Sequence, residues 1–329
     1  MARVTEVDAG QLCAPTGSQE YIANVQVTEW HNIFGRFEEN QNFRTDRLEY
    51  KRTGSEPGLV IIFNFEEFEN TTARPGSSKD VDDIVTCLAR LGFNINPKHI
   101  FNNLSKDEML ENVSEILAAD HSQVNSVLVF VLTHGGPSNT LSTSIDKFNA
   151  EELWVKFDKC PSLEGKPKMF VIQACKGENH TTFLVKPEDT PLVPLSTFSS
   201  GYIPRDMIIV YSTMEGKYAY RDRESGSWLI QEICRNFTAY GRRDDVLTVL
   251  SRVSKCICRN YYTNSRKTIV KQVPVVVSTL SRKFYLNNNK DRHLVLNTLV
   301  TQDETLEKIK FISKKINSIL GFAKKNNNT

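Results

Sequence analysis

A histidine and a cysteine in this sequence each follow a run of apolar residues. His134 comes after the apolar run at 127–132 and precedes two glycines, and Cys175 comes after the run at 168–172. Continuous apolar runs of this length are typical of strands in a parallel sheet, whose carboxyl ends meet at the edge where ligands bind. The pattern therefore predicts an imidazole and a thiol within reach of each other, an arrangement suited to nucleophilic catalysis by cysteine.

Either residue alone would have an ordinary explanation. A lone histidine is most often a satisfied core residue, and a lone cysteine is most often an inert buried thiol. His134 and Cys175 together, at the ends of two strands, favour a catalytic pair over two unrelated core residues.

The chain around this pair alternates between short apolar runs and amphipathic segments, which predicts an α/β fold with a mostly parallel central sheet flanked by helices. Two of the helices are expected to begin with capping boxes, at Ser77-x-x-Asp80 and Ser105-x-x-Glu108. A stretch rich in proline and serine at 178–205 is expected to be a long exposed loop. Strands are expected at 59–63, 127–132, 168–172, 207–211 and 273–280, and helices at about 77–91, 105–118, 227–237 and 244–254.

Composition excludes several classes of protein. The chain has 329 residues, 41 Lys+Arg against 39 Asp+Glu, and 40% hydrophobic residues, so neither dominant disorder nor a nucleic-acid partner is expected. No apolar run is long enough for a membrane span. Seven cysteines form no regular disulfide pattern, and Cys256-Ile-Cys258 has no second pair of zinc ligands nearby. We therefore expect a cytoplasmic protein without a metal ion or another cofactor.

The segment around the cysteine resembles a known signature. Gln173-Ala174-Cys175-Lys176-Gly177 is similar to the Gln-Ala-Cys-x-Gly signature of caspases, which have a histidine roughly 50 residues upstream. The resemblance covers about 49–287 and implies the three-layer sandwich of that family. Further segments that resemble caspase segments, in caspase order, are 58–82, 126–136, 204–216, 221–237 and 273–286.

The resemblance also implies catalytic roles. Cys175 would be the nucleophile and His134 the general acid and base, while the backbone amides of Gly135 and Cys175 would form the oxyanion hole. A backbone carbonyl near Thr72 would orient the histidine.

Substrate binding follows from the same resemblance. Caspases cut after aspartate, and they bind that side chain with two arginines and a glutamine; Arg74, Arg221 and Gln173 stand at the matching positions. Tryptophan is common in caspases where this chain has Tyr220. Three aromatic residues would line the pockets for neighbouring substrate residues: Tyr218, Tyr220 and Trp228.

The sequence also suggests how the chain is organised and activated. We expect a short leader (1–48), a large-subunit portion (49–189), a small-subunit portion (190–288) and an amphipathic helical extension (289–329). Asp8, in Thr5-Glu6-Val7-Asp8, and Asp189, in the loop, are candidate processing sites. The short leader resembles that of executioner caspases, which implies activation by an upstream caspase, regulation by inhibitor proteins and dimerisation through the edge strand at 273–280.

These observations predict a cysteine endopeptidase that cuts protein substrates after aspartate in programmed cell death or a related proteolytic cascade. The main alternative is a catalytically silent homologue that regulates another caspase by forming a heterodimer with it. A related cysteine peptidase that cuts after Arg, Lys or Asn would need an acidic or neutral pocket, which the paired arginines disfavour. A thiol-reactive enzyme of another class would lack the pocket residues.

Overall fold

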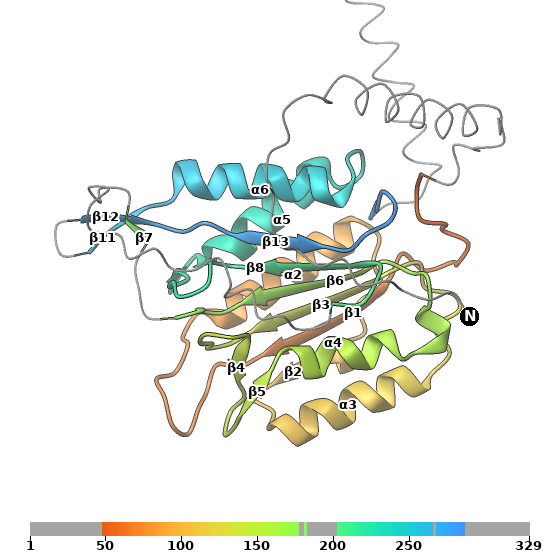
Figure 1. Cartoon of the computed structure of the whole chain (residues 1–329), viewed down its shortest axis with the longest axis horizontal. Helices are drawn as coiled ribbons and strands as arrows, with labels where there is room; N and C mark the ends of the chain where they lie inside the picture. The colour runs from red at the N-terminus through yellow and green to blue at the C-terminus, as the bar shows by residue number, and fades with distance from the viewer. Residues whose placement is uncertain (1–47, 178–180, 183–202, 266–267, 287–329) are drawn as a thin grey trace, which may run out of the picture. The chain divides into compact units, whose positions relative to one another are not determined.

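The computed structural model describes residues 48–177, 181–182, 203–265 and 268–286 (Figure 1). Six strands form the central sheet in the order β13-β8-β6-β3-β1-β2. Neighbouring strands are parallel except β13, which is antiparallel to β8. The predicted α/β fold with a mostly parallel sheet is confirmed. The six strands are β1 Leu59–Asn64, β2 Ile100–Asn102, β3 Val127–Leu132, β6 Lys168–Gln173, β8 Met207–Tyr211 and β13 Val275–Ser278.

Helices cover both faces of this sheet. On one face lie α2 (Ser77–Arg90), α5 (Trp228–Tyr240) and α6 (Val246–Asn260), and on the other lie α3 (Lys106–Ala118) and α4 (Glu151–Asp158) (Figure 1). Every residue of the strands β1, β3, β6 and β8 is buried, as the apolar runs within them require, and the polar residues Asn64, Lys168 and Gln173 at strand ends are buried as well.

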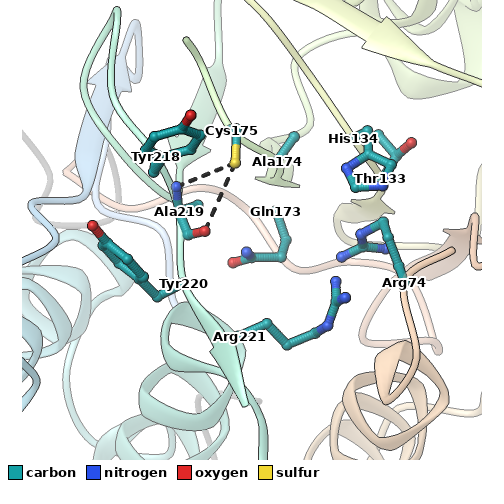
Figure 2. Close-up of a pocket in the computed structure, with 10 residues that line it drawn as sticks. All are labelled: Arg74, Thr133, His134, Gln173, Ala174, Cys175, Tyr218, Ala219, Tyr220 and Arg221. Atoms are coloured by element: carbon teal, nitrogen blue, oxygen red, sulfur yellow. Dashed lines mark hydrogen bonds between the residues drawn. The ribbon is translucent and has the colours of Figure 1, made fainter. Parts of the chain in front are cut away.

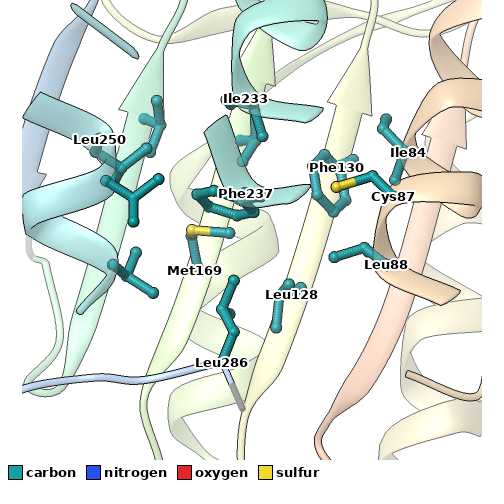
Figure 3. Packing of buried hydrophobic residues seen from close by; sticks show 14 of the residues in the cluster. Ile84, Cys87, Leu88, Leu128, Phe130, Met169, Ile233, Phe237, Leu250 and Leu286 are labelled. Carbon is teal, nitrogen blue, oxygen red and sulfur yellow. The ribbon is translucent and has the colours of Figure 1, made fainter. Parts of the chain in front are cut away.

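Two hydrophobic clusters fill the space between the sheet and its helices. Alternate residues of a strand belong to different clusters because successive side chains point to opposite faces. Leu128 and Phe130 of β3 pack with residues of α2 and α5, as Figure 3 shows. Val129 and Val131 pack on the other face, with Trp154 of α4.

Several short elements were not predicted, because they have too few residues for a periodic pattern. They connect the main elements or border the edge of the sheet that carries the catalytic pair. They are η2 Pro97–His99, β4 Thr140–Ser142, β5 Lys147–Asn149, η3 Pro161–Leu163, β7 Thr181–Thr182, β9 Arg221–Asp222, β10 Gly226–Ser227, β11 Thr263–Ser265 and β12 Thr268–Lys271.

One predicted capping box is present and the other is wrong. Ser105 accepts the backbone N–H of Glu108, and the Glu108 carboxylate accepts the Ser105 N–H. Helix α2 has no such cap, because its N-cap residue is Gly76, in a left-handed conformation with φ 86°. The hydroxyl of Ser77 instead donates to Oδ1 of Asn64 at 2.7 Å. Asp80 is directed to another partner, described below.

Some predictions can be compared only with the described residues, and others lie outside them. Among the described residues, no helix has the length and apolar character that crossing a membrane requires. No group of three or more His, Cys, Asp or Glu side chains is placed to hold a metal ion in that part of the chain. The two candidate processing sites, Asp8 and Asp189, and the extension at 289–329 lie outside the described residues.

Candidate active site

The two predicted catalytic residues come from neighbouring strands. Strands β3 and β6 pair in parallel register with Leu132 opposite Gln173. His134 and Cys175 each lie two residues beyond these strand ends, so they meet at the same edge of the sheet. Both line a cavity of about 420 Å³ (Figure 2).

The ring of His134 is held on two sides. Its Nε2–H donates to the backbone carbonyl of Thr72 at 2.7 Å, so Nδ1 is the nitrogen that can accept a proton. The ring of Phe68 packs against it with a distance of 4.7 Å between ring centroids. Burial lowers the pKa of His134, and the nearby Arg74 and Arg221 act in the same direction, whereas the bond to Thr72 opposes them. The ring is therefore neutral at neutral pH and available as a base.

The thiol of Cys175 is bound to the backbone of Ala219. The Ala219 N–H donates to Sγ at 3.4 Å, and Sγ–H donates to the Ala219 carbonyl at 3.7 Å. Figure 2 shows the sulfur directed toward Ala219, with the His134 ring across the pocket. Rotation about the Cα–Cβ bond of Cys175 is therefore needed to turn the sulfur toward the imidazole.

Glycine at 135 allows the two catalytic loops to approach each other closely. A Cβ atom at this position would lie 2.6 Å from the carbonyl oxygen of Cys175. The bridge between Gly135 and Leu141 uses the His134 carbonyl and the Gly136 N–H, bonded at 2.9 Å each to Ser142 and Thr140. In this pattern the N–H of Gly135 points away from Leu141 and is available to a ligand.

Three polar side chains converge on the same cavity. Arg74 is only 2% exposed, and its Nη1 donates to the Phe65 carbonyl at 2.9 Å. Nε of Arg221 donates to the Pro75 carbonyl at 3.2 Å. Gln173 is buried, and its Oε1 has no hydrogen-bond partner among the described residues. Burial lowers the pKa of both arginines, to about 9 for Arg74, so both remain charged at neutral pH.

Asp80 was not predicted as a site residue, because its spacing from Ser77 is typical of a helix cap. It is fully buried, and its carboxylate accepts the N–H of Ser227 at 2.7 Å and the hydroxyl of the same residue at 2.5 Å. Burial raises the pKa of Asp80, while Ser227 and the charges of Arg74 and Arg221 lower it. Asp80 thus adds a negative charge beside the two arginines. No local sequence pattern distinguishes it from a capping residue.

The three predicted aromatic residues occupy different places. Tyr218 and Tyr220 line the cavity. Trp228 is not among its lining residues and instead stacks on Tyr220, with 4.8 Å between ring centroids. Gln272 was not predicted as a site residue; it is fully buried, and its Oε1 accepts the backbone N–H of Tyr220 at 2.7 Å. Its sequence context, in a short strand region, carries no signal for this role.

The chain is similar to known proteins in sequence and in fold. The Caspase domain family matches residues 57–285. The chain is 31% identical to caspase-1 of Spodoptera frugiperda over 242 residues, which are 71% of this chain and 79% of that protein. It is 31% identical to caspase-3 of Bos taurus over 246 residues, 72% and 86% of the two chains. The crystal structure of caspase-1 from Spodoptera frugiperda is similar in fold, with a TM-score of 0.65 and 30% identity over 74% of this chain and 95% of that chain.

A histidine and a cysteine at adjoining strand ends, within this fold, define a cysteine-type endopeptidase. The chain belongs to the caspase family.

Proposed function

We propose that this caspase cuts protein substrates after aspartate residues. The observation that carries the proposal is that Arg74, Arg221 and Gln173 line the same cavity as Cys175 and His134. A substrate carboxylate in that cavity receives charge-assisted hydrogen bonds from the guanidinium groups, which are about twice as strong as bonds between neutral groups. Lysine or arginine would meet two like charges there, and asparagine would gain no ionic attraction.

Acylation begins when Sγ of Cys175 attacks the carbonyl carbon of the scissile bond. The thiol proton passes to Nδ1 of His134, which is the accepting nitrogen because Nε2–H is bonded to Thr72. Backbone N–H groups of Gly135 and Cys175 stabilise the oxyanion, and one such donor typically contributes about 10²- to 10³-fold in rate. The protonated imidazole then donates to the leaving nitrogen as the C–N bond breaks, which leaves a thioester.

Deacylation reverses the proton path with water as the nucleophile. Water attacks the thioester carbon and gives a proton to Nδ1 of His134. The C–S bond then breaks, Sγ of Cys175 regains the proton, and the fragment ending in aspartate leaves as a carboxylic acid. Each residue is thereby returned to its starting state.

We further propose an executioner-like enzyme that is made as a zymogen, is cut at Asp8 and Asp189 by an upstream caspase and acts in programmed cell death in the cytoplasm. Cys175 can act as a nucleophile only while its thiol is reduced, which supports a reducing compartment. Strand β13 lies at one edge of the central sheet, which supports a homodimer formed through that strand.

Hydrolysis of a fluorogenic tetrapeptide ending in aspartate tests the main proposal. The purified full chain is compared with its Cys175→Ala variant, and the same peptide ending in asparagine serves as the substrate control. Cys256→Ala is a matched control because it removes a thiol from helix α6, outside the cavity. We expect activity in the full chain and in the Cys256 variant, and none in the Cys175 variant or with the asparagine peptide.

The mass of each fragment in the same samples tests whether Asp8 and Asp189 are cut. Equal hydrolysis of the aspartate and asparagine peptides would contradict the specificity. If no activity arises even after treatment with an active caspase, the chain is instead the silent regulator, and a heterodimer with another caspase becomes the function to test.

A further inference from the structure

The cleft continues on the other side of Cys175. A second cavity, of about 930 Å³, lies beside the first and is more than twice as large. Both cavities are lined by His134, Cys175 and Tyr218, so they meet at the catalytic pair. The second cavity is bounded by the segment from Phe68 to Thr71 and by the hairpin of β4 and β5.

The direction of a bound peptide follows from where the charges lie. Arg74, Gln173 and Arg221 line only the first cavity, so the aspartate before the scissile bond is bound there. The nitrogen on the other side of that bond must lie near His134, which protonates it. The residues that follow the bond therefore extend into the second cavity, which we call the leaving-side groove.

Hydrogen bonds hold the walls of the leaving-side groove. In the turn between β4 and β5, the Thr143 N–H donates to the Asp146 carbonyl at 2.8 Å, and the Asp146 N–H donates to the Thr143 hydroxyl at 2.9 Å. The Ser144 hydroxyl donates to the Leu104 carbonyl at 2.9 Å. The Glu69 N–H donates to the Ser144 carbonyl at 2.9 Å, which joins the two walls. The groove is therefore preformed.

Many of the side chains that line the leaving-side groove are polar, but two large apolar side chains, Phe68 and Ile145, line it as well. Phe68 packs on the His134 ring and is half-buried. Ile145 is 45% exposed, which is unusual for a large apolar residue in the described part of this chain. Asp146 and Lys147, next to it, carry opposite charges, so this wall does not favour one sign of substrate charge.

We propose that the leaving-side groove selects an apolar side chain among the first three residues after the scissile bond, and that Ile145 is the residue that determines this preference. The inference rests on the proposed function, because it requires an aspartate in the first cavity. An apolar substrate side chain would cover the exposed part of Ile145 and remove both surfaces from water.

Four internally quenched peptides test this inference. They are identical up to the scissile aspartate and carry three serines after it, with leucine replacing none, the first, the second or the third serine. We expect at least one leucine peptide to have a kcat/KM about tenfold above that of the serine peptide. Ile145→Ser is expected to abolish this preference. Leu48→Ser is the matched control, because it removes an apolar side chain of 62% exposure outside the groove.

A tetrapeptide with a fluorescent dye after the aspartate separates the two proposals, because it has no residues for the leaving-side groove. If the dye substrate is hydrolysed and the four peptides are cut at equal rates, the groove inference alone is overturned. Retention of the leucine preference in the Ile145 variant would overturn it as well. Failure of the wild type to hydrolyse the dye substrate, even after treatment with an active caspase, would overturn the proposed function and this inference together.

Discussion

Arg74 and Arg221, which line the first cavity, differ in burial, and the less buried one can be substituted with less risk to the fold. Arg74 is almost fully buried, and its guanidinium also supports the backbone at Phe65. Arg221 is only partly buried, and its Nε bonds to the Pro75 carbonyl. Substitution of Arg221 therefore tests aspartate binding with less risk to the fold.

We expect Arg221→Lys to lower kcat/KM on the aspartate tetrapeptide by about 10- to 100-fold, the loss of one hydrogen bond to a charged group. Lysine keeps the charge but lacks the planar fork that binds a carboxylate through two parallel bonds. Steady-state kinetics measure the effect. Arg223→Lys is the control, because Arg223 is exposed and does not line the cavity. An equal loss in both variants would show an effect that is not specific to the cavity.

The pH dependence of activity should report the environment of His134. Burial lowers the pKa of this imidazole below its ordinary value of about 6.5. Protonation removes the base, so kcat/KM should fall only when the pH drops below about 6.5. Phe68→Ala exposes the ring to water and reduces the penalty on its charged form, so the acidic limb should move to higher pH. A limb that moves to lower pH in this variant would contradict the assignment.

At the scale of elements, one buried carboxylate joins a helix to the strand pair that carries Arg221. Asp80 lies in the first turn of α2, and Ser227 of β10 donates to it twice. Ser227 also pairs with Arg221 in the ladder between β9 and β10. This chain of contacts fixes the position of Arg221 relative to α2.

We expect Ser227→Ala to lower the free energy of unfolding by about 1–3 kcal/mol, because the buried Asp80 carboxylate loses its hydroxyl donor. The same variant should lower kcat/KM, because only the backbone N–H of residue 227 then still donates to Asp80, so the strand pair that positions Arg221 is linked less firmly to α2. Denaturant unfolding and kinetics measure the two effects. Ser251→Ala in α6 is the matched control, because Ser251 is exposed, and its unfolding free energy should change by less than about 0.5 kcal/mol.

The main elements were predictable because their sequence patterns are strong. Strands β3 and β8 have the predicted bounds, and α3 begins directly after its capping serine, Ser105. Helix α4 was missed because its eight residues span little more than two turns, too few for a clear period. The cap predicted at Ser77 was wrong because both of its polar groups have tertiary partners: the Ser77 hydroxyl donates to Asn64, and the Asp80 carboxylate accepts from Ser227.

The pair formed by His134 and Cys175 could be predicted because parallel strands bring their carboxyl ends together. The bonds of the Cys175 sulfur to Ala219 could not, because they join segments 44 residues apart, and no local pattern encodes such a contact. The same limit explains why Gln272 was missed as the partner of the Tyr220 backbone.

In the molecule as a whole, the edge strand β13 leaves one side of the central sheet open to pairing with another strand. Pairing alternates along antiparallel strands, and the Thr279 N–H donates to the Met207 carbonyl. The N–H groups of Val276 and Ser278 therefore point outward from the sheet. An outward row of this kind can pair with the same strand of a second copy.

We expect the full chain to sediment at twice its chain mass of 37.5 kDa and Ser278→Lys to shift it toward the monomer. Lysine at an edge opposes strand pairing, and in a twofold dimer each strand would add one positive charge. Sedimentation velocity measures the shift. Ser251→Lys adds the same charge to an exposed position on α6 and should leave the dimer intact. A monomeric wild type would remove the basis of this prediction.

The buried carboxylate of Asp80 also affects the net charge around the first cavity. Two guanidinium groups and the Asp80 carboxylate leave one net positive charge, and Glu66 is partly exposed, so water screens it. One aspartate side chain therefore brings the occupied pocket to electroneutrality. A phosphorylated serine would make the net charge of the occupied pocket negative, and an amide would leave it positive. We therefore expect the pocket to favour a side chain with one negative charge, in addition to any preference for its shape.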